Sequence, residues 1–306
     1  MSPNAVVSIV VPAYNRRGLI RQTLDSVRAQ RYRPLELVVV DDGSTDGTAD
    51  FVEEWSWSVA PDVRTILLRQ ANQGASAARN AGIEASTGDF LQFLDSDDLL
   101  APDKLAVDLD LLAAHPAAPY TWCRTVQLGG SRRHHTYLGG PIRALPHDVP
   151  KHNWHISGLL VRSAAVKRSG GFATDCRRSG DWEFAARLKF RCGYGVFHPR
   201  VGSSYRIHQD EQLTKGPLNQ YLDARERALL HIVRLIDELP SADLGGRAAR
   251  DQLCLEMIRC ALGYLRIGNL RAGTRCLSQA ESIMPRGAPA ERLHRLSKVA
   301  LTKLFD

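Results

Sequence analysis

The sequence predicts an α/β fold in which a mixed sheet carries helices on both faces and is followed by an α-helical C-terminal region. Three observations predict it. Short β-branched apolar runs alternate with amphipathic segments over the first hundred residues. Strand-like runs separated by Gly-rich and basic loops then continue to residue 206, and beyond Pro217 the apolar residues recur almost only at helical spacing. We therefore expect one domain over residues 1–215 and a helical region over 216–306.

The first elements form a β-α-β unit. Residues 6–11 are nearly all apolar and β-branched, which is typical of a strand buried on both faces. Apolar residues at helical spacing predict a helix over 19–30, and a second strand follows at 35–40. The alternation continues with a helix over 46–57, a strand over 63–68, a helix over 76–86 and a strand over 90–94. Because each crossover is far longer than a hairpin turn, these strands should pair in parallel.

The later elements are less regular. A helix over 103–114 ends at His115-Pro116, and further strands are predicted over 120–128, 156–161 and 196–206. We expect the sheet to become mixed in this part of the chain. After Pro217 the apolar spacing predicts four helices, two of them joined at Gly268-Asn269.

Composition restricts the class of protein. The 306 residues are 44% hydrophobic and 24% charged, as in ordinary folded chains and unlike disordered or collagenous ones. No apolar stretch reaches the ~18–20 residues of a membrane span, and the N-terminus lacks the features of a signal peptide, so we expect a cytoplasmic protein. The six cysteines include no C-x-x-C pair, which predicts free thiols. The net charge of +7 suits a phosphorylated or polyanionic partner.

Polar residues gather where the predicted parallel strands end. Ligands of open parallel sheets bind beyond the carboxyl ends of the strands, so these positions are the candidate site. Five carboxylates should meet at this edge: Asp41, Asp42, Asp95, Asp97 and Asp98. Their mutual repulsion predicts either unusual protonation or a divalent cation such as Mg²⁺ or Mn²⁺.

Other classes of phosphate-binding protein fit poorly. The chain has neither a G-x-x-x-x-G-K-[ST] loop nor a G-x-G-x-x-G turn after its first strand, which argues against P-loop kinases and dinucleotide oxidoreductases. Its basic residues are scattered and no aromatic stacking platform is evident, so we expect no nucleic-acid partner.

Four sequence motifs occur in order along the first hundred residues. They are Val7–Asn15, Val39–Thr48, Asn72–Gly82 and Phe93–Asp98. In these motifs the chain resembles the family-2 glycosyltransferases, over residues 5–210. The resemblance implies a GT-A type, Rossmann-like sheet. It also implies transfer of a sugar from a nucleoside-diphosphate-sugar donor, with UDP-sugars preferred, to a sugar or glycoconjugate acceptor.

The resemblance also implies roles for individual residues. Three residues would wall the base and ribose of the donor: Pro12, Tyr14 and Asn15. Asp42 would accept a hydrogen bond from the base, and Arg79 would lie near the base or the diphosphate. Asp95, followed by Ser96 in the same donor-binding segment, would hold the ribose or a metal-bound water. Asp97 and His208 would ligate the divalent cation.

A carboxylate at the start of a later helix would be the catalytic base. Asp181 is the candidate, and Glu183 is a rival because Gly180 stands where the family segment usually has Glu. One base and no positioned second nucleophile predict a single displacement that inverts the anomeric configuration.

Several alternatives stay open at this point. The chain could be a catalytically inactive GT-A-like nucleotide-binding module, or a sugar nucleotidyltransferase. His152 and His155 flank Trp154 at a spacing that fits either a zinc site or a loop beside the acceptor. The arginines of the last region, among them Arg286, Arg292 and Arg295, fit a solvated face, a homodimer contact or an anionic membrane surface at the inner face of the membrane.

Overall fold

A computed structural model describes residues 4–59, 63–129, 137–138, 155–208, 217–238 and 246–284. The chain divides into two compact units. The first comprises Met1–Pro141, Asn153–Thr174 and Arg191–Asp210, and the second comprises Ile142–His152, Asp175–Phe190 and Glu211–Asp306. Among the described helices, none combines the length and apolarity needed to cross a membrane.

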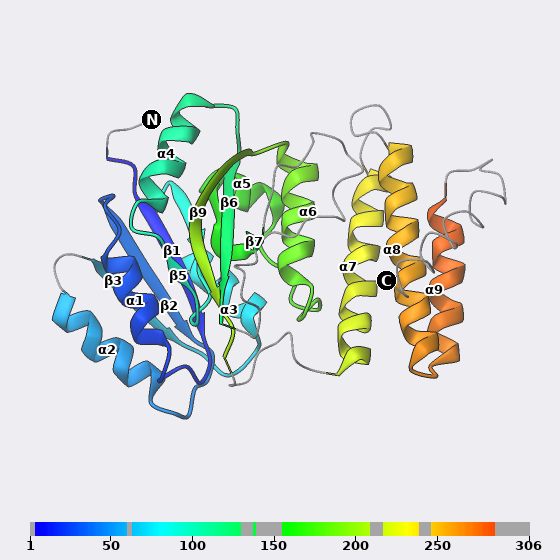
Figure 1. Ribbon diagram of the computed structural model, residues 1–306, viewed down its shortest axis with the longest axis horizontal. Coiled ribbons are helices and arrows are strands. Elements are labelled where there is room, and N and C mark those ends of the chain that lie inside the picture. The colour runs from blue at the N-terminus through cyan, green and yellow to red at the C-terminus, as the bar shows by residue number, and fades with distance from the viewer. Residues whose placement is uncertain are drawn as a thin grey trace. The chain divides into compact units, whose positions relative to one another are not determined.

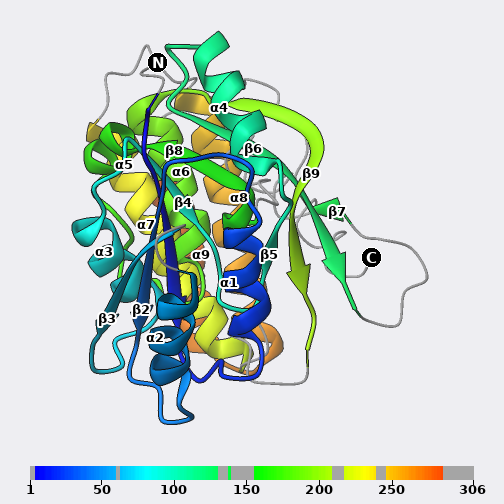
Figure 2. The ribbon, with the colours of Figure 1, turned by 90° about the vertical axis from the view of Figure 1, so that its left-hand side faces the viewer.

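The first unit is built on one sheet, whose strands are labelled in Figures 1 and 2. In the described residues it has nine strands in the order β3-β2-β1-β4-β8-β6-β9-β5, with β7 paired to β6. The strands are β1 (Val7–Ala13), β2 (Leu35–Asp41), β3 (Arg64–Arg69), β4 (Phe90–Phe93), β5 (Leu99–Leu100), β6 (Tyr120–Leu128), β7 (Tyr137–Leu138), β8 (Leu159–Arg162) and β9 (Val196–Arg206).

Strand direction follows the sequence prediction. β1 pairs in parallel with both β2 and β4, and β2 pairs in parallel with β3. β8 runs antiparallel to β4 and β6, while β9 is parallel to β6. The prediction of a parallel beginning and a mixed continuation is therefore confirmed.

Helices cover both faces of this sheet. Alternate side chains of β1 and β2, such as Ile9 and Leu37, pack in one cluster with residues of three helices: α1 (Ile20–Arg28), α2 (Thr48–Val59) and α4 (Lys104–Ala114). The intervening side chains Val38 and Val40 pack with Ala78 of α3 (Ala75–Ala85) on the opposite face. A further short helix, α5 (Ser163–Ser169), follows β8.

Helix α3 lies unusually close to the sheet. A Cβ atom added to Gly82 would be 2.4 Å from Cγ1 of Val10, far inside van der Waals contact. Gly82 therefore permits the approach of α3 to β1, and this approach sets the position of Arg79 and Asn80 on the preceding turn of the helix.

The second unit is helical in its described residues. It holds most of α6 (Gly180–Cys192) together with α7 (Leu218–Glu238), α8 (Gly246–Arg266) and α9 (Leu270–Ile283). Their apolar faces share one core, which includes Phe190, Leu229 and Met257. The predicted junction at Gly268-Asn269 is confirmed, because Asn269 caps α9 by accepting a hydrogen bond from the backbone N–H of Ala272, at 3.1 Å.

One prediction differs from the structure. The run 156–161 was expected to be a strand throughout, but residues Ile156–Gly158 form a 3₁₀ turn and β8 begins only at Leu159. The cause is a pair of contacts with residues far away in the chain: the Ser157 carbonyl accepts from the Gln92 side chain at 3.0 Å, and the Ser157 hydroxyl donates to Asp98 at 3.0 Å. Beyond residue 217 the described residues form three helices, and the fourth predicted helix lies outside them.

Candidate functional site

The candidate site lies where the strand order of the sheet reverses. The chain runs from β1 to β2 and β3 on one side, and then returns to place β4 on the other side of β1. The carboxyl ends of β1 and β4 are therefore neighbours, as expected for ligand sites in open α/β sheets. Asn15 and Arg16 follow β1 here, and the acidic segment 95–98 follows β4.

Asn15 joins the loops that follow β1 and β2. Its backbone has a positive φ of 49°, which Asn tolerates better than most residues. Its N–H donates to the Ser44 hydroxyl and its side-chain oxygen accepts from the N–H of Thr45, both at 2.9 Å. Beside it Pro12 is buried in β1, whereas Tyr14 is 41% exposed. These three predicted donor-site residues thus form one continuous edge.

Asp42 is buried and already engaged with the loop that precedes α3. Its carboxylate accepts from the Gln70 side chain at 2.8 Å and from the N–H groups of Gln73 and Gly74 at 2.9 and 2.7 Å. A carboxylate offers about four acceptor positions, so about one remains for a ligand. The side chain therefore holds the start of α3 in place, whatever else it binds.

Arg79 of α3 pairs with Asp95 after β4. The guanidinium donates to Asp95 Oδ1 at 2.6 Å and lies 5.2 Å from the ring centroid of Phe172. Burial opposes ionisation of Asp95, but Arg79 and His155 outweigh it and hold the pKa of this carboxyl below its usual value. Asp95 is therefore an anion at neutral pH.

Asn80 of α3 fixes the loop after α5. Its side-chain oxygen accepts from the N–H of Phe172 at 2.7 Å, and its amide donates to the Phe172 carbonyl at 2.9 Å. Gly171 has a φ of 68°, and a Cβ there would be 2.7 Å from the Asn80 oxygen. The contact holds Phe172 beneath Arg79.

Asp97 lies between two basic groups. Its Oδ2 is 2.9 Å from Nε2 of His208 and 3.3 Å from Nε of Arg16. Adjacent ligands of an octahedral ion with bonds of 2.0–2.1 Å are about 3 Å apart, so the Asp97 and His208 donor atoms fit one divalent cation. Both side chains are largely shielded, with 15% and 11% of their surface exposed.

Asp98 is the buried member of the acidic segment. It accepts from the Ser157 hydroxyl at 3.0 Å and from the N–H of Arg206 at 3.2 Å, and Nδ1 of His155 is 3.4 Å away. Burial, with the nearby charges of Asp95 and Asp97, raises the pKa of Asp98 well above its usual value. This is the direction of shift that mutual repulsion within an acidic edge predicts. Asp95, Asp98 and His155 also offer donor atoms within 4.8 Å of one another.

Arg206 links the acidic segment to α1. Its guanidinium donates to the Asp97 carbonyl, to the Leu19 carbonyl at 3.2 Å and to the Thr23 hydroxyl at 3.1 Å. The Thr23 hydroxyl in turn donates to the carbonyl of the buried Ser96 at 2.9 Å. Segment 95–98 is therefore held from β9 and from α1 at once.

Asp181 belongs to the second unit and lies in the first turn of α6, together with Glu183. Glu183 is buried, and both of its oxygens accept from Arg187, at 2.8 and 2.7 Å. Trp182 between them lies under the Arg225 guanidinium, 3.8 Å from its ring centroid. The rival base Glu183 is thus held in an ion pair. His152, Trp154, Arg286, Arg292 and Arg295 lie outside the described residues.

Comparison with known proteins identifies the family. The sequence model of the family described as "Glycosyl transferase family 2" matches residues 8–169, more than half of the chain. This chain belongs to that family. Its motifs had indicated the same family.

Relatives of this family member match over its first part. The glycosyltransferase GlyA of Streptococcus pneumoniae is 40% identical over 97 residues, which cover 32% of this chain and 14% of GlyA. An uncharacterized glycosyltransferase of Haemophilus influenzae is 28% identical over 194 residues, covering 60% of this chain and 62% of the relative. The chain thus spans less than two thirds of either relative.

Solved structures show that the chain has the GT-A fold. Residues 1–349 of S. aureus TarS in complex with UDP-GlcNAc superpose with a TM-score of 0.62 at 15% identity, covering 92% of this chain and 93% of that one. The mannosyltransferase PcManGT of Pyrobaculum calidifontis, in complex with GDP-Man and Mn²⁺, gives a TM-score of 0.57 at 22% identity, covering 99% and 81%.

Sequence reasoning assigned no role to two basic groups of the acidic edge, Arg16 and Arg206, and it placed His155 in a zinc site or in a loop beside the acceptor rather than beside Asp98. A signal was available for the two arginines, because each stands at or shortly after the end of a predicted strand and a buried acidic segment needs counter-charges. No sequence pattern pairs His155 with Asp98, since the neighbours of His155 in the sequence are loop residues.

Proposed function

We propose that the enzyme transfers one sugar from a nucleoside-diphosphate-sugar, with UDP-sugars preferred, to a hydroxyl of a sugar or glycoconjugate, inverting the anomeric configuration. The observation that carries the proposal is Asp97, held between His208 and Arg16 at the strand-order reversal of the sheet. Breaking the bond from C1 of the sugar to a diphosphate leaves negative charge on the phosphate, and this is where positive charge must be supplied.

Donor binding would use the edge formed by the first two strands. Pro12, Tyr14 and Asn15 would contact the base and ribose, and the remaining acceptor position of Asp42 would receive a hydrogen bond from the base. The 41% exposure of Tyr14 supports this role, because an exposed ring offers a face to a planar ligand.

The middle of the donor would meet α3 and the acidic segment. Asp95 would accept from the ribose or from a water. Arg79 would keep that carboxylate ionised and in place through its 2.6 Å hydrogen bond. Ser96 lies between Asp95 and Asp97. The Thr23 hydroxyl donates to the Ser96 carbonyl and would thereby hold this segment in place beside the donor.

Asp97 and His208 would hold a divalent cation, Mn²⁺ or Mg²⁺, since their donor atoms are separated as adjacent ligands are. Such an ion, when bound, neutralises charge on the leaving nucleoside diphosphate. Arg16 adds a permanent positive charge on the same carboxylate and would bind a phosphate oxygen when the pair opens. The Mn²⁺ in the PcManGT complex supports the cation.

Asp181 would take the proton from the acceptor hydroxyl as its oxygen forms a bond to C1 and the bond from C1 to the diphosphate breaks. Glu183 is less suited to this role, because its two oxygens already accept from Arg187. A single base without a second nucleophile gives inversion.

Transfer assays with a panel of nucleotide sugars and acceptors, with and without Mn²⁺, test the proposal. We expect a β-configured product from an α-linked donor, and a loss of about 10²-fold or more in rate for Asp97→Ala. Asp110→Ala, an exposed carboxylate on α4, is the matched control and should keep the wild-type rate. Retention of the donor's configuration, or equal rates for both variants, would overturn it.

A further inference from the structure

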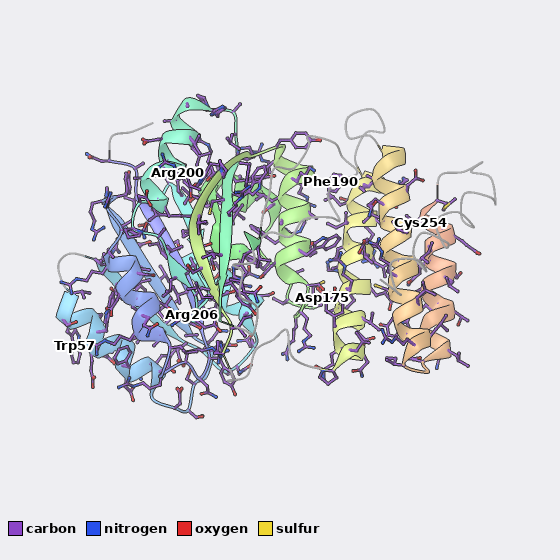
Figure 3. The ribbon with its side chains drawn as sticks, viewed as in Figure 1. Trp57, Asp175, Phe190, Arg200, Arg206 and Cys254 are labelled. Atoms are coloured by element: carbon purple, nitrogen blue, oxygen red, sulfur yellow. The ribbon has the colours of Figure 1, made fainter. Side chains whose placement is uncertain are left out.

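A second group of metal-ligating side chains lies in the helical unit, outside the residues assigned to sugar transfer. It consists of Asp175 and Cys176, in the loop before α6, and His231 of α7. Cys176 Sγ is 3.8 Å from Nδ1 of His231 and 3.6 Å from Oδ1 of Asp175. Figure 3 labels Asp175. A sulfur, a nitrogen and an oxygen donor therefore meet within 4.8 Å of one another.

A fourth donor faces the same point. Oε1 of Glu183 is 3.8 Å from Nδ1 of His231, the nitrogen that faces Cys176. Arg187 holds Glu183 by two hydrogen bonds. On the other side of the imidazole ring, Nε2 of His231 is 3.2 Å from Oδ2 of Asp175. The Asp175 carboxylate thus holds the imidazole with Nδ1 facing the thiol, and it would move from Nε2 to the ion when a metal binds.

The separations match those in a tetrahedral zinc site. With Zn–S bonds of about 2.3 Å and Zn–N or Zn–O bonds of about 2.0–2.1 Å, neighbouring donors stand about 3.3–3.6 Å apart. The observed 3.6 and 3.8 Å are within a few tenths of an ångström of this, so small side-chain movements would close the site.

We propose that Asp175, Cys176 and His231 bind one Zn²⁺ ion, with Glu183 or a water as the fourth ligand. The thiol and imidazole favour zinc over Mg²⁺ or Mn²⁺, which prefer oxygen ligands. The site is therefore chemically distinct from Asp97 and His208, which offer no sulfur. Binding replaces the thiol proton of Cys176, so one proton leaves for each ion bound.

A reactive thiol is a poorer explanation of the same residues. Cys176 is fully buried, and burial, together with Asp175 and Glu183, raises the pKa of its thiol to about 12. A nucleophilic or redox-active cysteine needs the opposite environment, exposed and electropositive. The nearby Arg227 donates to the Asp175 carbonyl at 2.8 Å and leaves the carboxylate of Asp175 to His231 and the thiol.

The ion would join the loop before α6 to α7. The Cys176 carbonyl accepts from the N–H of Ser179 at 2.8 Å, and the Ser179 carbonyl accepts from the N–H of Glu183 at 2.9 Å. Zinc held at Cys176 and His231 would therefore fix the first turn of α6, where Asp181 lies. Its role would be structural, and zinc affinity would not depend on the proposed sugar transfer.

Co²⁺ titration of the untagged full chain in reducing buffer tests the site, because a cobalt–thiolate bond gives a near-ultraviolet charge-transfer band that oxygen and nitrogen ligands alone do not. We expect the band with wild type at about one Co²⁺ per chain, its loss on adding Zn²⁺, and a zinc-dependent rise in the melting temperature. Cys176→Ser and His231→Gln should lose the band. Cys254→Ser is the matched control, a buried cysteine of α8 labelled in Figure 3, and should retain it.

The absence of a thiolate band in wild type would overturn the proposal, and so would a band of full strength in Cys176→Ser. If Cys176→Ser does not fold, the titrations of wild type and His231→Gln still test whether the site binds the metal. Elemental analysis after dialysis gives a second readout: about one zinc per chain for wild type and Cys254→Ser, and less than about one tenth of that for His231→Gln.

Discussion

Replacing Arg206 with Gln tests how the acidic segment is held. Arg206, labelled in Figure 3, stands at the end of β9 and donates to acceptors on α1 and to the carbonyl of Asp97. Gln is shorter and uncharged, and cannot reach the acceptors on α1 and the Asp97 carbonyl at the same time. The substitution therefore leaves the half-buried carbonyls of Leu19 and Asp97 without their donor.

The size of the effect follows from these contacts. Three hydrogen bonds from a charged donor to partly buried acceptors are lost, at about 1 kcal/mol each after exchange with water. The bond to Gln22 at 2.6 Å is exposed and adds little. We expect about 3 kcal/mol of destabilisation, which lowers the melting temperature by about 6–12 °C for a unit of this size. Arg206→Lys keeps the charge but not the planar fork, so its loss should be intermediate.

Thermal unfolding followed by circular dichroism measures the loss, and Arg200→Gln is the matched control. Arg200 is on the same strand, but its side chain is 69% exposed and its ion pair with Asp103 spans 3.9 Å. We expect the control to melt within about 2 °C of wild type. Equal melting temperatures for Arg206→Gln and wild type, or an equal loss in Arg200→Gln, would refute the reasoning.

Three further predictions concern other contacts. Asp181→Asn should lower kcat by about 10²–10⁴-fold while the Kd for the donor, measured by calorimetry, stays unchanged. An unaltered kcat would show that another group is the base. Asn80→Ala should cost about 2–3 kcal/mol in chemical denaturation, since it removes both hydrogen bonds to the Phe172 backbone, whereas the exposed Asn72→Ala should be neutral. Burial opposes ionisation of Glu36, but hydrogen bonds from Thr87 and Ser8 outweigh it and lower its pKa, so its stabilisation is present above about pH 4.5 and is lost as the pH falls. The melting gap between wild type and Glu36→Gln should therefore close in acid, and a gap independent of pH would contradict this.

Most of the fold could be predicted because local patterns agreed with the tertiary structure. The strands expected at 120–128 and 196–206 are β6 and β9 with the same bounds. The start of β8 could not be predicted, because the turn at Ser157 depends on Gln92 and Asp98, which are 65 and 59 residues away in the chain.

The acids of the candidate site could be predicted from the sequence, whereas the pairing of each acid with its basic partner could not. Carboxylates at strand ends carry a local signature, since each follows an apolar run. Their partners do not: Arg206 contacts Asp97 and Asp98 across 109 and 108 residues, and only the folded sheet brings them together. Asp42 shows a further limit, because its three hydrogen bonds to the loop before α3 have no signature in the sequence.

The contacts made by β9 and the residues after it come from a part of the chain that is synthesised late. His208 and Arg206 emerge from the ribosome 111 and 108 residues after Asp97 and Asp98, the carboxyl groups with which they pair. A fragment ending at residue 169, where the family match stops, would carry the four motifs of the first hundred residues and yet lack both of these groups. Its acidic segment would keep the contacts from Thr23, Arg79 and Ser157 but lose those from residues 206 and 208, so these four motifs alone do not define the smallest piece of the chain that holds the complete candidate site.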